Sequence, residues 1–176
     1  ISSIRGLSIR PAKRGNAGEV YSAIMWRNAA ATVEGCHLST HQGATCHVAG
    51  PETVAVIRGC ELTGGAQNAV WVTEGASGAV EDSRIRGNTY PLMVTGEGAS
   101  LRVTGCEVVD TQQEGIAGGG GAVVVVERTT VSRNGGVGID LRWAGAGSRV
   151  EDCVIEANAS HGIDVTGGSG KIGRAH

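Results

Sequence analysis

The tetrapeptide Val33-Glu34-Gly35-Cys36 returns near the other end of the chain as Val150-Glu151-Asp152-Cys153. Four related tetrapeptides lie between these two: Ile57-Arg58-Gly59-Cys60, Val80-Glu81-Asp82-Ser83, Val103-Thr104-Gly105-Cys106 and Val126-Glu127-Arg128-Thr129. The fourth residues of consecutive copies are separated by 24, 23, 23, 23 and 24 residues. Ile4-Arg5-Gly6-Leu7 fits as an earlier copy, 29 residues before the first. The chain is therefore an array of repeats.

The rest of each copy keeps the same register. An aliphatic residue stands two positions after each tetrapeptide, and these residues are Ile9, Leu38, Leu62, Ile85, Val108, Val131 and Ile155. A second apolar pair, such as Cys46/Val48 or Ile163/Val165, follows nine to twelve positions after the tetrapeptide, and a glycine-rich turn comes next. Apolar residues at every second position are typical of strands, and no segment sustains the period of a helix.

The repeat predicts how the copies are arranged in space. One copy cannot bury its apolar residues alone, whereas stacked copies close a core and pair each strand with the coils above and below. Crossovers between parallel strands are right-handed in nearly all proteins. We therefore predict an all-β fold, a right-handed parallel β-helix (solenoid) of about seven coils with three short parallel sheets. With coils about 4.8 Å apart, the rod is roughly 30 Å long.

The domain organisation follows from the same register. We expect a single β-helix domain over residues 1–176, with a first coil at 1–30 and regular coils at 31–170. A basic loop at 10–18 is expected to project from the first coil. The chain begins at Ile1 and not at Met, which indicates a fragment of a longer protein.

The fourth tetrapeptide position forms one inward column, which consists of Cys36, Cys60, Ser83, Cys106, Thr129 and Cys153. A small, weakly polar side chain at a bend suits each of these positions. Zinc ligands usually stand two to four residues apart, so a spacing of about 23 does not predict a metal site. The histidines 37, 41 and 47 fall on two strands and a turn, and we expect no metal or cofactor. Buried free thiols favour a reducing compartment such as the cytoplasm.

Two further columns have a structural interpretation. Asn88, Asn134 and Asn158 occupy equivalent turns, where stacked Asn side chains are expected to hydrogen-bond between coils and to tolerate left-handed backbone. An outward column consists of Arg5, Glu34, Arg58, Glu81, Thr104, Glu127 and Glu151. The first part of this column alternates in sign, which favours pairing across strands.

Composition excludes two classes of partner. The 176 residues carry a formal net charge of −2, so the chain has no basic footprint for nucleic acid. The longest apolar run is about twelve residues, and a membrane helix needs roughly twenty. We therefore expect no nucleic-acid partner and no membrane partner.

The coil pattern, from the Val-Glu-Gly-Cys tetrapeptide to Gly138-Ile139 and Gly162-Ile163, resembles the right-handed parallel β-helix repeat superfamily. That superfamily has a pectate-lyase-like fold and includes repeats of the carbohydrate-binding and sugar-hydrolase type. Its members include lyases, hydrolases, epimerases, phage tailspikes and binding modules without activity, so the resemblance implies the coil and not a site. No catalytic motif of pectate lyases or epimerases matches this chain, and no catalytic residue is transferred.

One outward column contains candidate functional residues. Asp140 and Asp164 stand at the same place in consecutive copies, so both are expected to point to solvent about 5 Å apart. Paired carboxylates at that distance can do acid–base chemistry on a sugar or hold a cation. His47, Trp71 and Met93 occupy the same column in earlier coils. Together the five residues are a candidate ligand-binding face, and the alternative is an ordinary solvated surface.

Three functions remain open. The copies from Cys36 to Cys153 differ in length by one residue, which leaves no long loops to build a catalytic cleft. This regularity favours a non-catalytic binding or scaffold module of a larger protein, with a flat ribbed face for a carbohydrate or protein partner. The first alternative is a carbohydrate-active enzyme (a polysaccharide lyase, hydrolase or epimerase) or part of one, with Asp140 and Asp164 as catalytic candidates.

A second alternative is a segment of a phage or surface fibre, which predicts a stable trimer. Unpaired strand edges at the two ends of the rod also predict end-to-end self-association or a neighbouring domain.

Overall fold

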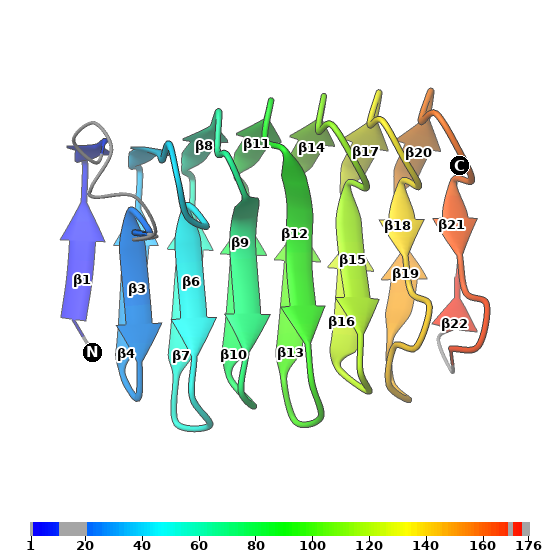
Figure 1. The fold of residues 1–176 in the computed structure, drawn as a ribbon, viewed down its shortest axis with the longest axis horizontal. Helices are drawn as coiled ribbons and strands as arrows, with labels where there is room; N and C mark the ends of the chain where they lie inside the picture. Colours follow the sequence, from blue (N-terminus) through cyan, green and yellow to red (C-terminus); the bar gives the residue numbers. More distant parts are fainter. Residues whose placement is uncertain (1, 11–20, 169–170, 174–176) are drawn as a thin grey trace.

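The computed structural model describes residues 2–10, 21–168 and 171–173 (Figure 1). The predicted basic loop at 10–18 therefore lies outside the described residues except for Arg10. Within the described part of the chain, no helix is long and apolar enough to cross a membrane.

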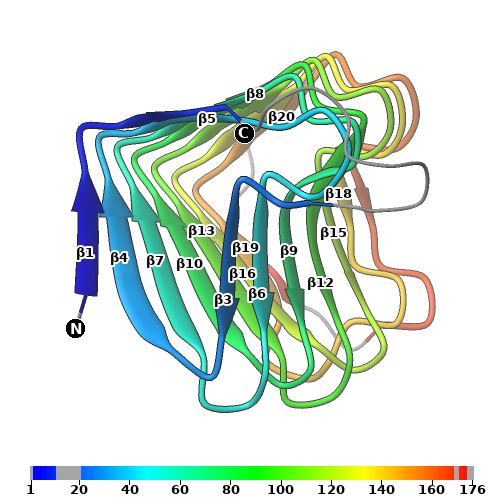
Figure 2. The same ribbon diagram turned by 60° about the vertical axis from the view of Figure 1, so that its left-hand side comes forward.

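The described strands form three parallel sheets, seen obliquely from one end in Figure 2. Sheet A contains β1 (Ser2–Arg5), β4 (Ala30–Glu34), β7 (Val54–Arg58), β10 (Ser77–Glu81), β13 (Ser100–Thr104), β16 (Val123–Glu127), β19 (Arg149–Glu151) and β22 (Lys171–Ile172). Sheet B contains β2 (Ser8–Ile9), β5 (His37–Ser39), β8 (Glu61–Thr63), β11 (Arg84–Arg86), β14 (Glu107–Val109), β17 (Thr130–Ser132) and β20 (Val154–Glu156). Sheet C contains β3 (Ile24–Arg27), β6 (Cys46–Ala49), β9 (Asn68–Thr73), β12 (Tyr90–Thr95), β15 (Ile116–Gly119), β18 (Ile139–Asp140) and β21 (Ile163–Asp164).

The strand register is the register of the tetrapeptides, and the predicted parallel β-helix is confirmed. Val33 pairs with Ile4 on one side and with Ile57 on the other, so equivalent residues of consecutive copies lie side by side. Each coil contributes one strand to each sheet, which gives seven strands in sheets B and C and eight in sheet A among the described residues. The inward residues are mainly Val, Ile, Leu, Ala and Cys, and they form one continuous core.

The bend between sheets A and B explains the third position of the tetrapeptide. Residues with positive φ stand there in every copy: Gly6, Gly35, Gly59, Asp82, Gly105, Arg128 and Asp152. Gly adopts this left-handed conformation without steric cost, and Asp tolerates it better than most side chains. Arg128, with φ of 48°, adopts it although its side chain does not favour it.

The column that starts at Cys36 is buried and hydrogen-bonded from coil to coil. The Cys60 N–H donates to Oγ of Ser83 at 3.0 Å, and the Cys106 N–H donates to Oγ1 of Thr129 at 3.2 Å. The Cys36 N–H makes a longer contact of 3.4 Å to Sγ of Cys60. Cys, Ser and Thr can replace one another here because each offers a small acceptor to the preceding coil.

Burial also determines the state of these thiols. All five cysteines are free and buried. Loss of solvation raises the pKa of the Cys106 thiol to about 11 and also raises the pKa of Cys60 and Cys153. These three thiols are therefore protonated and serve as small apolar groups of the core.

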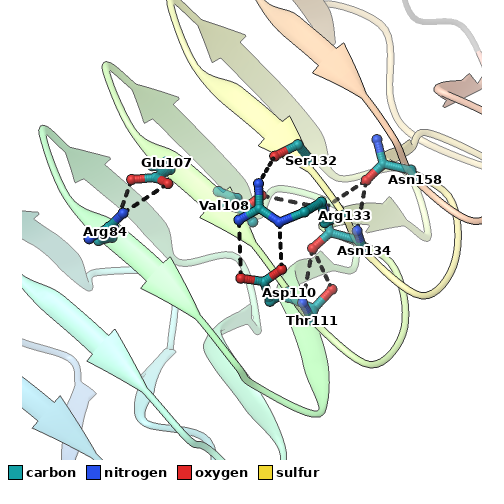
Figure 3. Close-up of polar contacts among 9 residues, drawn as sticks. All are labelled: Arg84, Glu107, Val108, Asp110, Thr111, Ser132, Arg133, Asn134 and Asn158. Atoms are coloured by element: carbon teal, nitrogen blue, oxygen red, sulfur yellow. Dashed lines mark hydrogen bonds and ion pairs between the residues drawn. The ribbon is translucent and has the colours of Figure 1, made fainter.

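The turn asparagines form a second set of hydrogen bonds between coils, and Figure 3 shows the part around Asn134 and Asn158. Asn134 accepts the Thr111 N–H at 3.0 Å, and it donates to the Val108 carbonyl at 3.3 Å and to Oδ1 of Asn158 at 2.9 Å. Asn88 bridges coils in the same way through the Gly65 N–H.

These asparagines do not adopt the left-handed conformation that they were expected to tolerate. Positive φ belongs to the residue before each of them, which is Gly87, Arg133 and Ala157 respectively. The earlier bend turns each Asn side chain toward the coil interior, where it reaches the backbone of its neighbours.

The outward charges of sheet A pair across strands. Arg5 contacts Glu34 at 3.1 Å, and Arg58 contacts Glu81 at 2.7 Å. The two like charges near the C-terminal end, Glu127 and Glu151, are both within reach of Arg149, at 2.8 and 3.6 Å. These partly exposed pairs each contribute little to stability.

Candidate functional site

The candidate ligand-binding residues lie in one outward column of sheet C. Strand pairing aligns His47 with Trp71, Trp71 with Met93, Met93 with Ala117, Ala117 with Asp140, and Asp140 with Asp164. Each residue comes from a different coil, so the column runs along the rod. The column is defined here as the sheet C column.

The first two side chains of the column are stacked aromatic rings. The His47 and Trp71 rings have centroids 4.7 Å apart and planes inclined by 11°, so they stack along the rod like the coils that carry them. Nε2 of His47 lies 3.3 Å from Oγ1 of Thr73. Burial and the nearby Arg27 guanidinium lower the pKa of His47, which keeps the imidazole uncharged near neutral pH.

A groove of about 490 Å³ lies over the middle of the column. Its lining consists of Gln67, Asn68, Trp71, Tyr90, Met93, Gln113, Glu114, Ala117 and Asp140. The groove is deepest at Ala117, because this side chain is a single methyl group between the longer side chains of Met93 and Asp140. We call this hollow the Ala117 groove.

The two aspartates of the column are held by one guanidinium. Arg142 contacts both carboxylate oxygens of Asp140, at 3.0 Å from Nε and 2.5 Å from Nη2. Its Nε also lies 3.6 Å from Oδ2 of Asp164. The expectation that both carboxylates point freely to solvent is wrong for Asp140, which is only 8% exposed.

The electrostatics do not resemble those of a working acid–base pair. The backbone N–H of Thr166 and the Arg142 guanidinium hold the pKa of Asp164 below its ordinary value. The hydrogen bond and the charge of Asp140, followed by the charge of Asp164, raise the pKa of Arg142 above its ordinary value. A glycosidic acid catalyst needs a carboxyl whose pKa is raised enough to retain its proton, which Asp164 is not.

Several residues that line the groove could not be predicted from the repeat pattern of the sequence. Gln67, Gln113 and Glu114 come from the turns that lead into sheet C, and those turns differ in sequence from coil to coil. Asn68 is the first residue of β9. Arg142 could have been found, because it stands two positions after Asp140 and side chains two apart share one side of an extended chain.

A second hollow, of about 420 Å³, lies on the outer face of sheet A. Its lining is mostly Val, Ala, Ser and Gly, together with Arg102 and Arg149. Both guanidiniums are paired with Glu127, at 3.0 and 2.8 Å. This hollow therefore offers few polar groups that could orient a ligand. Among the residues that the structure describes, no three His, Cys, Asp or Glu side chains gather as they would around a metal ion.

Comparison with known proteins gives one clear match. The family described as a right handed beta helix region matches residues 22–173. No curated protein matches the chain. Among solved structures, a trypsin-treated form of QnrB1, a plasmid-mediated fluoroquinolone resistance protein, is 13% identical over 98% of this chain and 91% of that chain. The TM-score of that superposition is 0.19.

Proposed function

Because the chain belongs to the right-handed β-helix family, we propose that it is a non-catalytic module that binds a carbohydrate on its sheet C face. The observation that carries this proposal is the Ala117 groove, which combines apolar and polar side chains in one hollow. Small-molecule sites are concave, mostly apolar and equipped with a few convergent polar groups.

The side chains of the groove suit a sugar. Trp71, Met93 and Tyr90 supply apolar surface for the C–H face of a ring, and Tyr90 is 40% exposed. Gln113 and Glu114 supply the amide and carboxylate groups that bind hydroxyls.

The state of the aspartates supports binding without catalysis. Arg142 makes a two-pronged contact that occupies both carboxylate oxygens of Asp140. The lowered pKa of Asp164 keeps that carboxyl ionised, and an ionised carboxylate cannot donate a proton to a leaving group. The rival enzyme function would have to use a different acid, and Glu114 is the other carboxylate of the groove.

Titration calorimetry with soluble oligosaccharides, combined with an assay for new reducing or unsaturated ends, tests the proposal. The wild type is expected to bind at least one oligosaccharide without cleaving it, and Trp71→Ala should weaken that binding at least about tenfold. Trp143→Ala is the matched control, because Trp143 is 68% exposed and does not line the groove. Turnover that disappears in Asp140→Asn or Glu114→Gln would replace the proposal with the enzyme function.

A further inference from the structure

The sheet C column has one vacant place. Side chains on neighbouring coils are spaced by about 4.8 Å. Met93 and Asp140 are two coils apart with only the Ala117 methyl group between them, so they leave a slot about as thick as one ring. The His47–Trp71 stack, at 4.7 Å, shows that this column accommodates rings at the coil spacing. A ligand ring over Ala117 would lie against Met93, which separates it from the His47–Trp71 stack by one coil.

The border of the slot is acidic. Glu114 lies three residues before Ala117 and lines the groove from the turn, while Asp140 lines it from the next coil. Glu114 is half-buried and Asp140 is buried, so neither carboxylate is fully screened by solvent.

Nearby cations do not neutralise this border completely. Arg142 is shared between Asp140 and Asp164, which leaves one excess negative charge in that cluster. Arg27, at the other end of the column, pairs with Glu74 at 2.7 Å. No Lys or Arg lines the groove. The Ala117 groove therefore repels uronic acids and attracts an ammonium group.

We propose that the Ala117 groove binds one residue of a cationic amino sugar, with the ring between Met93 and Asp140 and the ammonium group against the carboxylates of Glu114 and Asp140. This inference rests on the proposed carbohydrate-binding function and specifies its ligand class. Charge complementarity selects the ligand, and the slot at Ala117 sets the thickness of the ring that enters.

Calorimetry with four β-1,4-linked or α-1,4-linked tetramers tests this choice: glucosamine, N-acetylglucosamine, glucose and galacturonic acid. At about pH 6, where an amine carries its proton, the glucosamine tetramer should bind about tenfold more tightly than the neutral tetramers. Raising the salt concentration should reduce that preference. Equal or tighter binding of a neutral or uronic tetramer at the groove would overturn the amino-sugar assignment and leave the carbohydrate function standing. Binding of none of the four would overturn the amino-sugar assignment, and the wider panel above then decides the function separately.

Two variants separate shape from charge. Ala117→Met fills the slot with the same side chain that Met93 carries on the preceding coil. This variant should abolish binding of every tetramer. Ala79→Met is the matched control, because Ala79 is an outward alanine of β10 on sheet A and does not line the groove. Glu114→Gln should remove most of the preference for the charged sugar and keep weak binding of the neutral ones. An unchanged preference in Glu114→Gln would contradict the proposal.

Discussion

The asparagine column and the sheet C column run along the same rod and differ in almost every respect. The asparagine column has Asn in three coils and Thr111 in the coil between Asn88 and Asn134. Asn88 and Asn134 are buried and hydrogen-bond to the backbone of neighbouring coils. The sheet C column changes from imidazole to indole, thioether, methyl and carboxylate, and it leaves a hollow. Positions that the stack requires are therefore repeated in the sequence, whereas positions that it does not require are free to form a site.

The largest effect on stability is expected when one Asn side chain of the asparagine column is replaced. Asn134→Leu preserves the approximate volume but leaves the Thr111 N–H buried without its acceptor and removes one donor from the Val108 carbonyl. The free energy of unfolding should fall by about 4 kcal/mol, because each lost partner exposes a desolvation penalty of about 1–3 kcal/mol. Urea denaturation measures the change, and Gln112→Ala, at an exposed residue in the equivalent turn of the preceding coil, is the control.

Sugar binding provides the complementary readout for that variant. Under conditions where Asn134→Leu remains folded, its affinity for a groove ligand should be close to wild type. A large loss of affinity with little loss of stability would show that the asparagine column has a role beyond the fold.

A smaller effect is expected in the column of cysteines. Thr129→Val keeps the shape of the side chain but removes the acceptor of the Cys106 N–H and the donor to the Glu127 carbonyl. We expect a loss of about 2 kcal/mol in the free energy of unfolding. Thr129→Cys and Thr129→Ser should recover most of it, because both residues already occupy this column in other coils. If valine is tolerated as well as serine, the column selects for size alone.

The smallest effect concerns pH. Burial raises the pKa of Cys106 from 9.0 to about 11, so the folded state retains a proton that the unfolded chain releases. Below about pH 9 this contribution to stability is complete, and it is lost as the pH rises toward 11. Urea midpoints measured across this range should therefore decline. The decline should be shallower in Cys106→Ser, and identical slopes in the two proteins would contradict the assigned cause.

The sequence was sufficient to predict the stack and insufficient to predict the groove. The spacing of Cys36, Cys60 and the later members places every inward residue, because a coil cannot change length without displacing its neighbours. The same spacing aligned Trp71, Met93 and Asp140 in one column.

The groove itself depends on features that carry no period. Glu114 and Gln113 come from a turn that varies between coils, and the hollow exists because Ala117 is small. The burial of Asp140 also escaped prediction, since it follows from the path of the Arg142 side chain across the column.

The most direct measurement of the central claim is a map of backbone amide NMR shifts during titration with the glucosamine tetramer. We expect the largest shift changes in β9, β12, β15 and β18 and in the turn that contains Glu114. The shifts of β10 and β13 of sheet A and of the turn asparagines should remain nearly unchanged. If the ligand binds and the largest shifts fall on sheet A, the sheet C column is part of the scaffold and the assignment of the site is contradicted.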